Sequence, residues 1–192
     1  LVFAADGFKG ALASAKASST LGIVRSTRAI LENLIDTELI KSGANPAQNL
    51  ADFVEYAHVE QEKLKRLHGY TANITPQDIA AVAKFTDPAT GKVYKHWSKL
   101  SNVEKRAQQV GHKVTYDTFY RIASLATHGA SAFALMYQDV KGLVALQDGC
   151  LSLAVGMTYG IADNCYSVCG FADPTLTSIK TSLKNIKDQI II

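Results

Sequence analysis

The chain has 192 residues, of which 47% are hydrophobic and 19% are charged, and this composition is typical of a folded globular protein. The longest uncharged stretch after Asp148, residues 149–162, is shorter than the ~20 residues that cross a bilayer, so no membrane segment is expected. The three cysteines form no disulfide pattern and the first residues, LVFAADGFKG, do not resemble a signal peptide, so we expect a cytoplasmic protein.

Apolar residues in the first third of the chain recur at intervals of three and four, which predicts helices rather than a sheet. The first helix is expected over about residues 3–17. The second, from Ser19 to Ser42, has a serine to cap its start, and Gly43 and Asn45-Pro46 end it. The third is expected over about residues 46–68, with proline in its first turn.

The middle of the chain is less regular. Thr75-Pro76-Gln77-Asp78 has the form of a helix start, which predicts a short helix over 76–85. The other elements predicted here are a turn over residues 87–92, a helix over 101–110 capped by Ser101 with Glu104 in the capping-box position, a helix over 115–127 and a helical stretch over 131–138.

Residues 141–171 are predicted to form one long buried helix. Its glycines recur every seven residues at Gly142, Gly149 and Gly156, followed by Gly160. They indicate either close approach of another helix or breaks between shorter helices. A last amphipathic helix over 175–190 is expected to pack on the body or on the same helix of a second subunit. We therefore expect a single all-α domain over residues 1–192, a bundle of about seven or eight helices that forms a homodimer.

The segment Tyr116–His128, YDTFYRIASLATH, gathers chemically active side chains on one side of a helix. At about 100° per residue, Arg121, Ser124 and His128 share a narrow arc with Asp117, and Tyr120 lies on its border. A simpler interpretation also exists: Asp117 pairs with Arg121 one turn away, and His128 caps the helix end before Gly129.

Arg28 and Glu32 lie one turn apart on the second helix, beside its apolar stripe. Charges at the edge of a core need partners, and Tyr120 or Ser124 is expected to supply them. The alternative is an ordinary surface ion pair.

Residues 84–113 contain seven basic side chains and only two acidic ones, with Lys95 and Trp97 among interleaved aromatic residues. Such a segment is either a nucleic-acid surface or a solvated connector whose lysines keep the protein soluble. Cys165 and Cys169 are one turn apart, but no further ligand completes a metal set, so buried thiols are expected. No phosphate loop or other cofactor motif is present, and no cofactor or metal is predicted.

Two stretches resemble a family of bacterial helical proteins of uncharacterised function. They are Arg28-x3-Glu32 and Tyr120-x3-Ser124-x3-His128, and the Trp97 segment lies where that family also carries a tryptophan. The resemblance spans about residues 15–140. It implies an all-helical fold in which Arg28, Glu32, Tyr120, Ser124 and His128 share a site.

A second resemblance concerns Arg121-x6-His128, which is similar to the signature of HEPN domains. HEPN domains are up-and-down helical bundles of toxin–antitoxin and antiviral systems, and many are metal-independent RNases with a site shared across a dimer. The resemblance implies RNA as substrate, His128 as general acid or base and Arg121 as the cation that stabilises the phosphate. The chain departs from the signature at Ile122, where HEPN nucleases carry a polar residue.

Two functional hypotheses follow. The first is a HEPN-like, RNA-directed protein with an antitoxin or other protein partner. The second is a non-catalytic helical interaction module in which Arg28, Glu32, Tyr120, Ser124 and His128 form a structural network or bind a small ligand.

Overall fold

The computed structural model describes residues 2–127, 140–170, 177–178, 181–182 and 185. The regular elements in these ranges are helices, and one isolated antiparallel bridge joins Thr86 to Val93. The all-α prediction is therefore confirmed. The stretch predicted over 131–138 and most of the predicted helix over 175–190 lie outside the described residues.

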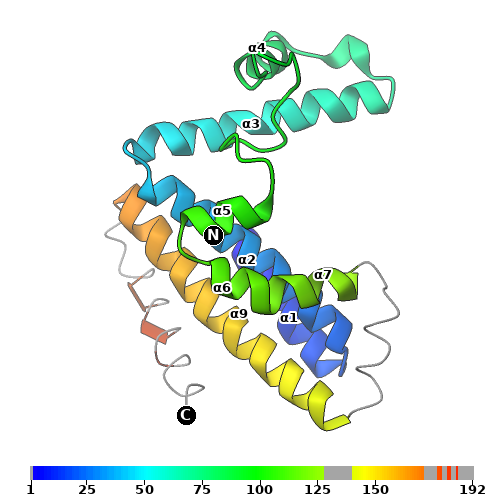
Figure 1. Cartoon of the computed structure of the whole chain (residues 1–192), viewed down its shortest axis with the longest axis vertical. Helices are drawn as coiled ribbons and strands as arrows, with labels where there is room; N and C mark the ends of the chain where they lie inside the picture. Colours follow the sequence, from blue (N-terminus) through cyan, green and yellow to red (C-terminus); the bar gives the residue numbers. More distant parts are fainter. Residues whose placement is uncertain (1, 128–139, 171–176, 179–180, 183–184, 186–192) are drawn as a thin grey trace.

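Three long helices form the body of the molecule: α1 (Val2–Lys16), α2 (Thr20–Ser42) and α9 (Val140–Cys169). Helix α2 lies at the centre and packs against both of the others (Figure 1). Its predicted start is confirmed, since the Ser19 hydroxyl accepts a hydrogen bond from the Gly22 backbone at 3.3 Å. The buried face of α2 includes Ile23, Thr27 and Ile30.

Helix α1 approaches α2 closely because glycine faces the contact. A Cβ atom on Gly7 would lie 2.9 Å from Cγ1 of the buried Ile30, and one on Gly10 would lie 3.0 Å from the Ser26 hydroxyl. A side chain at residue 7 would require Ile30 to shift, and one at residue 10 would require the Ser26 hydroxyl to move aside.

Helices α3 (Pro46–Leu67) and α4 (Pro76–Lys84) form an arm beyond one end of the body (Figure 1). A short 3-10 turn over Thr71–Asn73 lies between them. Both predicted helix starts are confirmed: α3 begins with proline in its first turn, and Thr75 and Asp78 form a reciprocal capping box at α4. The two helices pack together, with the rings of Tyr56 and Phe85 edge to face at 5.1 Å.

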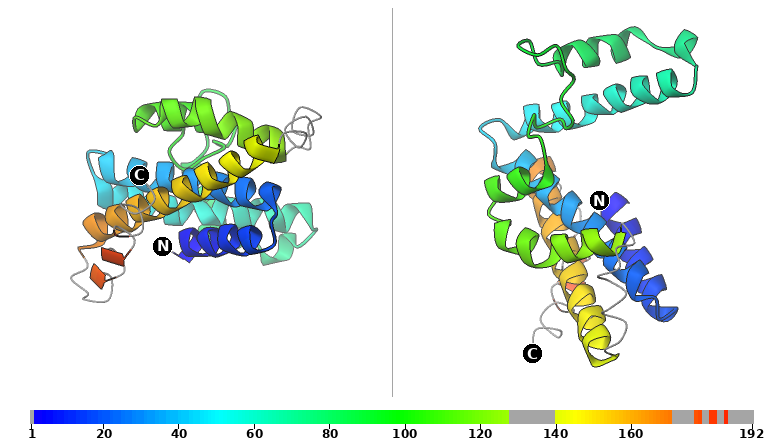
Figure 2. Two further views of the ribbon diagram at one scale, coloured as in Figure 1. Left: turned by 90° about the horizontal axis from the view of Figure 1, so that it is seen from below. Right: turned by 45° about the vertical axis from the view of Figure 1, so that its right-hand side comes forward.

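The chain returns from the arm to the body through α5 (Val103–Gln109), α6 (Lys113–Thr115), a π-helical turn η2 (Tyr116–Tyr120) and α7 (Arg121–Thr127). This segment lies on the opposite side of α2 and α9 from α1 (Figure 2). One prediction was wrong: α5 is capped by Asn102, whose side chain accepts from the Lys105 backbone, rather than by Ser101. Asn102 takes that role because it directly precedes the first helical residue.

The predicted long C-terminal helix is present as the single helix α9, but only part of it is buried, with Val144 and Leu153 among its exposed residues, and the glycine prediction is only partly correct. A Cβ on Gly160 would lie 3.0 Å from Leu34, which is a close helix approach. Gly149 and Gly156 have nothing within 4 Å of the same position, so packing does not require glycine there. Among the helices that the structure describes, none combines the length and apolarity needed to cross a membrane.

Candidate polar site at the junction of helix α2 and the π-turn

Arg28, Glu32 and Tyr120 form a closed triangle of hydrogen bonds. Arg28 Nε donates to Glu32 Oε1 at 3.1 Å, and Arg28 Nη2 donates to the Tyr120 hydroxyl at 2.8 Å. That hydroxyl in turn donates to Glu32 Oε1 at 2.9 Å. Of the two partners expected for the Arg28–Glu32 pair, the structure brings in Tyr120, and the simple surface pair is not what is observed.

Tyr120 is the buried member of this triangle, with only 7% of its surface exposed. Burial, and then the Glu32 carboxylate, raise the pKa of its hydroxyl above the ordinary value of 10.0. The Arg28 guanidinium also lies 4.7 Å from the centre of the Tyr120 ring. The phenol is therefore neutral at physiological pH, and the triangle ties α2 to the η2–α7 segment.

The backbone at Tyr116–Tyr120 is a π-helical turn, in which the Arg121 N–H bonds back to the Tyr116 carbonyl. The rings of Tyr116 and Tyr120 stack at 4.9 Å with 19° between their planes. Single π-turns inside helices occur frequently at functional sites. The helical angle assumed from sequence, 100° per residue, does not hold through this turn, so Tyr120 lies in the core rather than on a border.

Arg121 directly follows Tyr120 but points outward, and 60% of its side chain is exposed. Its guanidinium lies 3.2 Å from Asp117 and 3.7 Å from Glu104, and its Cζ is 5.9 Å from the Tyr116 ring. Lys113 contacts both acids, at 2.6 Å from Asp117 and 3.0 Å from Glu104. We call these four charged residues, Glu104, Lys113, Asp117 and Arg121, the surface cluster.

The charges of the surface cluster stabilise one another. Hydrogen bonding to Asp117 and Glu104 raises the pKa of Lys113, and Lys113 and Arg121 lower the pKa of Asp117. The predicted pairing of Asp117 with Arg121 is therefore present, and Tyr116 connects this cluster to the buried triangle.

Among the described residues, the predicted site residues Ser124, Lys95 and Trp97 do not join these groups. Ser124 is half-buried on α7, one turn after Tyr120. His128 lies outside the described residues, as does its relation to Arg121.

Lys95 and Trp97 lie on the connection between α4 and α5. Lys95 is exposed, whereas Trp97 is only 6% exposed and packs edge-on against Phe53 at 5.9 Å. The indole therefore contributes to the interior of the arm rather than to a surface on which a base could stack.

A buried charged group that was not predicted lies where the arm meets the body. Arg106 Nη1 donates to Asp36 Oδ1 at 2.9 Å, and His96 Nε2 lies 3.1 Å from the same oxygen and 2.6 Å from that nitrogen. Arg106 is one of the basic residues of the segment 84–113 that the sequence assigned to a surface. The one available signal was its position one turn from Asn102, on the inward side of α5 with Ala107.

The arm has its own buried carboxylate, Asp78. It accepts hydrogen bonds from Lys65 at 2.6 Å and from the Thr75 backbone at 2.8 Å, and its Oδ1 lies 2.9 Å from His58. Lys65, followed by Thr75 and His58, holds the pKa of Asp78 well below its ordinary range. This group stabilises the α3–α4 pair.

The cysteine prediction is partly wrong. Cys150 is buried, and burial raises the pKa of its thiol to about 11. Cys165 is half-buried and packs against the core, whereas Cys169 is exposed. In the part of the chain that the structure describes, no three His, Cys, Asp or Glu side chains gather as they would around a metal ion.

Residues 7–141 match a family of unknown function, DUF5677, and this range includes Arg28, Glu32 and Tyr120. No curated protein and no solved structure matches the chain. Because the match covers more than half of the sequence, the chain belongs to the DUF5677 family of unknown function.

Proposed function

We propose that this chain is a HEPN-like, RNA-directed protein of a bacterial defence or toxin system that acts in the cytoplasm and cleaves RNA without a metal ion. The observation that supports the proposal is the setting of Arg121. Its exposed guanidinium follows Tyr120, which Arg28 and Glu32 hold in the core. A cation that is held in place by a rigid part of the fold can stabilise the negative charge that develops on a phosphate during cleavage.

In the proposed reaction, an RNA 2′-hydroxyl attacks the adjacent phosphorus. The 2′-oxygen–phosphorus bond forms while the bond to the 5′-oxygen breaks, leaving a 2′,3′-cyclic phosphate and a 5′-hydroxyl. His128 takes the 2′-hydroxyl proton and passes it to the leaving 5′-oxygen, and Arg121 stabilises the phosphate oxygens. Two copies of the chain form the site together, as a homodimer.

Exposed lysines would hold the RNA backbone. Lys92, Lys95, Lys99 and Lys105 are all exposed. Lys99 lies 5.6 Å from the Tyr94 ring. Binding through such lysines is expected to weaken steeply as salt rises, because phosphate contacts release counterions.

The test is cleavage of total RNA by the full chain in EDTA, with His128→Ala and Arg121→Ala beside the wild type. Each variant is expected to lower the rate by about a hundredfold or more. Arg66→Ala is the matched control, because Arg66 is 63% exposed and pairs with Glu62 one turn away, as Arg121 does with Asp117. Equal rates for Arg66→Ala and Arg121→Ala would contradict the proposal.

A second candidate is a non-catalytic module that binds a protein partner or a small ligand. It is favoured by the pairing of Arg121 with Glu104 and Asp117, which already neutralise its charge. Expression in a bacterial host separates the two candidates. A nuclease toxin arrests growth as wild type and not as His128→Ala, whereas a binding module has the same effect in both forms.

A further inference from the structure

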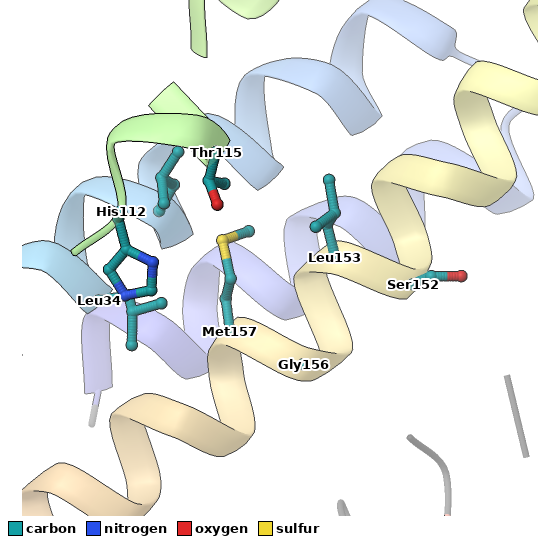
Figure 3. Close-up of a pocket in the computed structure, with 8 residues that line it drawn as sticks. Leu34, His112, Thr115, Ser152, Leu153, Gly156 and Met157 are labelled. Atoms are coloured by element: carbon teal, nitrogen blue, oxygen red, sulfur yellow. The ribbon is translucent and has the colours of Figure 1, made fainter. Parts of the chain in front are cut away.

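A pocket of about 380 Å³ lies between α2, the start of α6 and α9. Most of its wall is aliphatic and comes from Leu31 and Leu34 of α2 and from Leu153 and Met157 of α9 (Figure 3). His112 and Thr115 add polar groups on the α6 side. An apolar pocket of this size with a few polar groups is the usual form of a small-ligand site.

Gly156 keeps one side of this pocket open. Glycine is less favourable than alanine inside a helix, so its presence in α9 calls for a reason. Close packing is not that reason, because nothing lies within 4 Å of the position of a Cβ at Gly156. Residue 156 lines the pocket, so a longer side chain there is expected to narrow it.

His112 supplies the polar end. Its Nε2 lies 3.1 Å from Glu38 Oε2 and forms an ion pair with it. The N–H group does not point at the carboxylate oxygen well enough to form a hydrogen bond. Contact with this carboxylate raises the pKa of His112 above 6.5, which favours the protonated ring. Figure 3 shows the imidazole beside the pocket with one ring nitrogen turned toward Met157. In the protonated ring both nitrogens carry a proton, so this nitrogen can donate a hydrogen bond to a ligand in the pocket.

We propose that this pocket binds a medium-chain aliphatic carboxylic acid. The alkyl chain would lie along Leu31, Leu34, Leu153 and Met157, and the carboxylate would accept hydrogen bonds from His112 and the Thr115 hydroxyl. The proposal rests on the match between the aliphatic wall with one cationic donor and a ligand with one anionic end. It does not depend on the proposed RNA cleavage.

The first test is calorimetric titration of the full chain with hexanoate, octanoate and decanoate. Affinity is expected to rise about fourfold for each added methylene until the chain outgrows the pocket. Octan-1-ol is expected to bind at least about tenfold more weakly than octanoate, because it lacks the charge that His112 recognises. Absence of saturable octanoate binding, or equal affinity for the acid and the alcohol, would overturn the proposal.

The second test uses two matched substitutions in α9. Gly156→Leu and Gly149→Leu place the same side chain on the same helix, both with open space around the new Cβ, but only residue 156 lines the pocket. Gly156→Leu is expected to abolish octanoate binding and Gly149→Leu to preserve it, with both melting curves showing folded protein. Loss of binding in both variants, or in neither, would contradict the assigned pocket.

His112→Gln tests the polar end. It is expected to lower octanoate affinity at least about tenfold while the affinity for octan-1-ol stays the same. A parallel loss for both ligands would show that His112 acts on the shape of the pocket and not on the carboxylate, which would overturn the assigned ligand class.

Discussion

The hydroxyl of Tyr120 lies 2.9 Å from the carboxylate of Glu32, although the two residues are 88 positions apart in the chain. This bond closes the triangle with Arg28 and holds the π-turn against α2. The neighbouring Arg121 is thereby presented on the opposite, exposed side. The buried triangle thus determines where an exposed cation stands.

The hydroxyl of Tyr120 is expected to stabilise the fold. Tyr120→Phe keeps the ring and its stacking but removes the hydroxyl that bonds to both Arg28 and Glu32, which leaves only the bond between those two side chains. We expect the free energy of unfolding, measured by urea titration, to fall by about 1–2 kcal/mol. Tyr116→Phe is the control, because the Tyr116 hydroxyl makes no hydrogen bond with the described residues. Equal losses in both variants would show that the triangle contributes nothing specific.

Arg106 is expected to contribute more to the free energy of unfolding than any exposed lysine near it. It is only 8% exposed, and Arg106→Met leaves Asp36 with His96 alone at the junction of arm and body. We expect unfolding to become easier by about 2–3 kcal/mol. The adjacent, exposed Lys105→Met should stay within about 0.5 kcal/mol of wild type. A small change in the free energy of unfolding for Arg106→Met would mean that water readily takes the place of the guanidinium beside Asp36.

Asp78 is expected to make the arm sensitive to acid. The pKa of Asp78 is lowered in the folded state. The stability that its carboxylate contributes is therefore fully present above the unfolded pKa of 3.8, and it is lost as the pH falls from there through the folded pKa. Asp78→Asn should lower the free energy of unfolding by about 2–3 kcal/mol at pH near 6.

The difference between wild type and Asp78→Asn should shrink when the urea titrations are repeated at pH near 2.5. Glu60→Gln, an exposed change on α3, serves as the control and should shift stability little at either pH. A difference that stays constant across this range would contradict the ionic role of Asp78.

The glycines of α1 and α9 are expected to respond oppositely to alanine. Gly149→Ala should stabilise the protein by about 0.5–1 kcal/mol, because the new Cβ meets open space and alanine favours the helix. Gly7→Ala should give no gain or a loss, since its Cβ would lie 2.9 Å from Ile30. Thermal unfolding of both variants measures these changes in stability. A more stable Gly7→Ala variant would show that α1 can shift freely against α2.

Local patterns predicted the helices well. The starts of α2, α3 and α4 follow from Ser19, Pro46 and Thr75, because a cap acts on backbone groups only two or three residues away. The pairing of Arg28 with Glu32 was also predicted from sequence, either with a partner from Tyr120 or Ser124 or as an ordinary surface pair. The sequence did not show which partner the pair takes, because Tyr120 and Ser124 lie one turn apart and satisfy the same spacing.

Local sequence patterns did not predict which residues are buried in the irregular middle of the chain. Trp97 and Arg106 both belong to a basic, aromatic segment that looks exposed, yet both are buried. Their burial depends on Phe53 of α3 and Asp36 of α2, which are far away in the sequence. The pocket beside His112 depends likewise on three separate segments.

The amino-acid sequence by itself determined an all-helical chain, most helix ends and the short-range pair of Arg28 and Glu32, because spacing of three and four residues acts within a single helix. Only the tertiary structure decided that the helix at Tyr116–Tyr120 opens into a π-turn, that Tyr120 points inward while Arg121 points outward, and which charges are buried. These outcomes depend on contacts between distant segments, whose packing overrides the angle and exposure that local periodicity predicts.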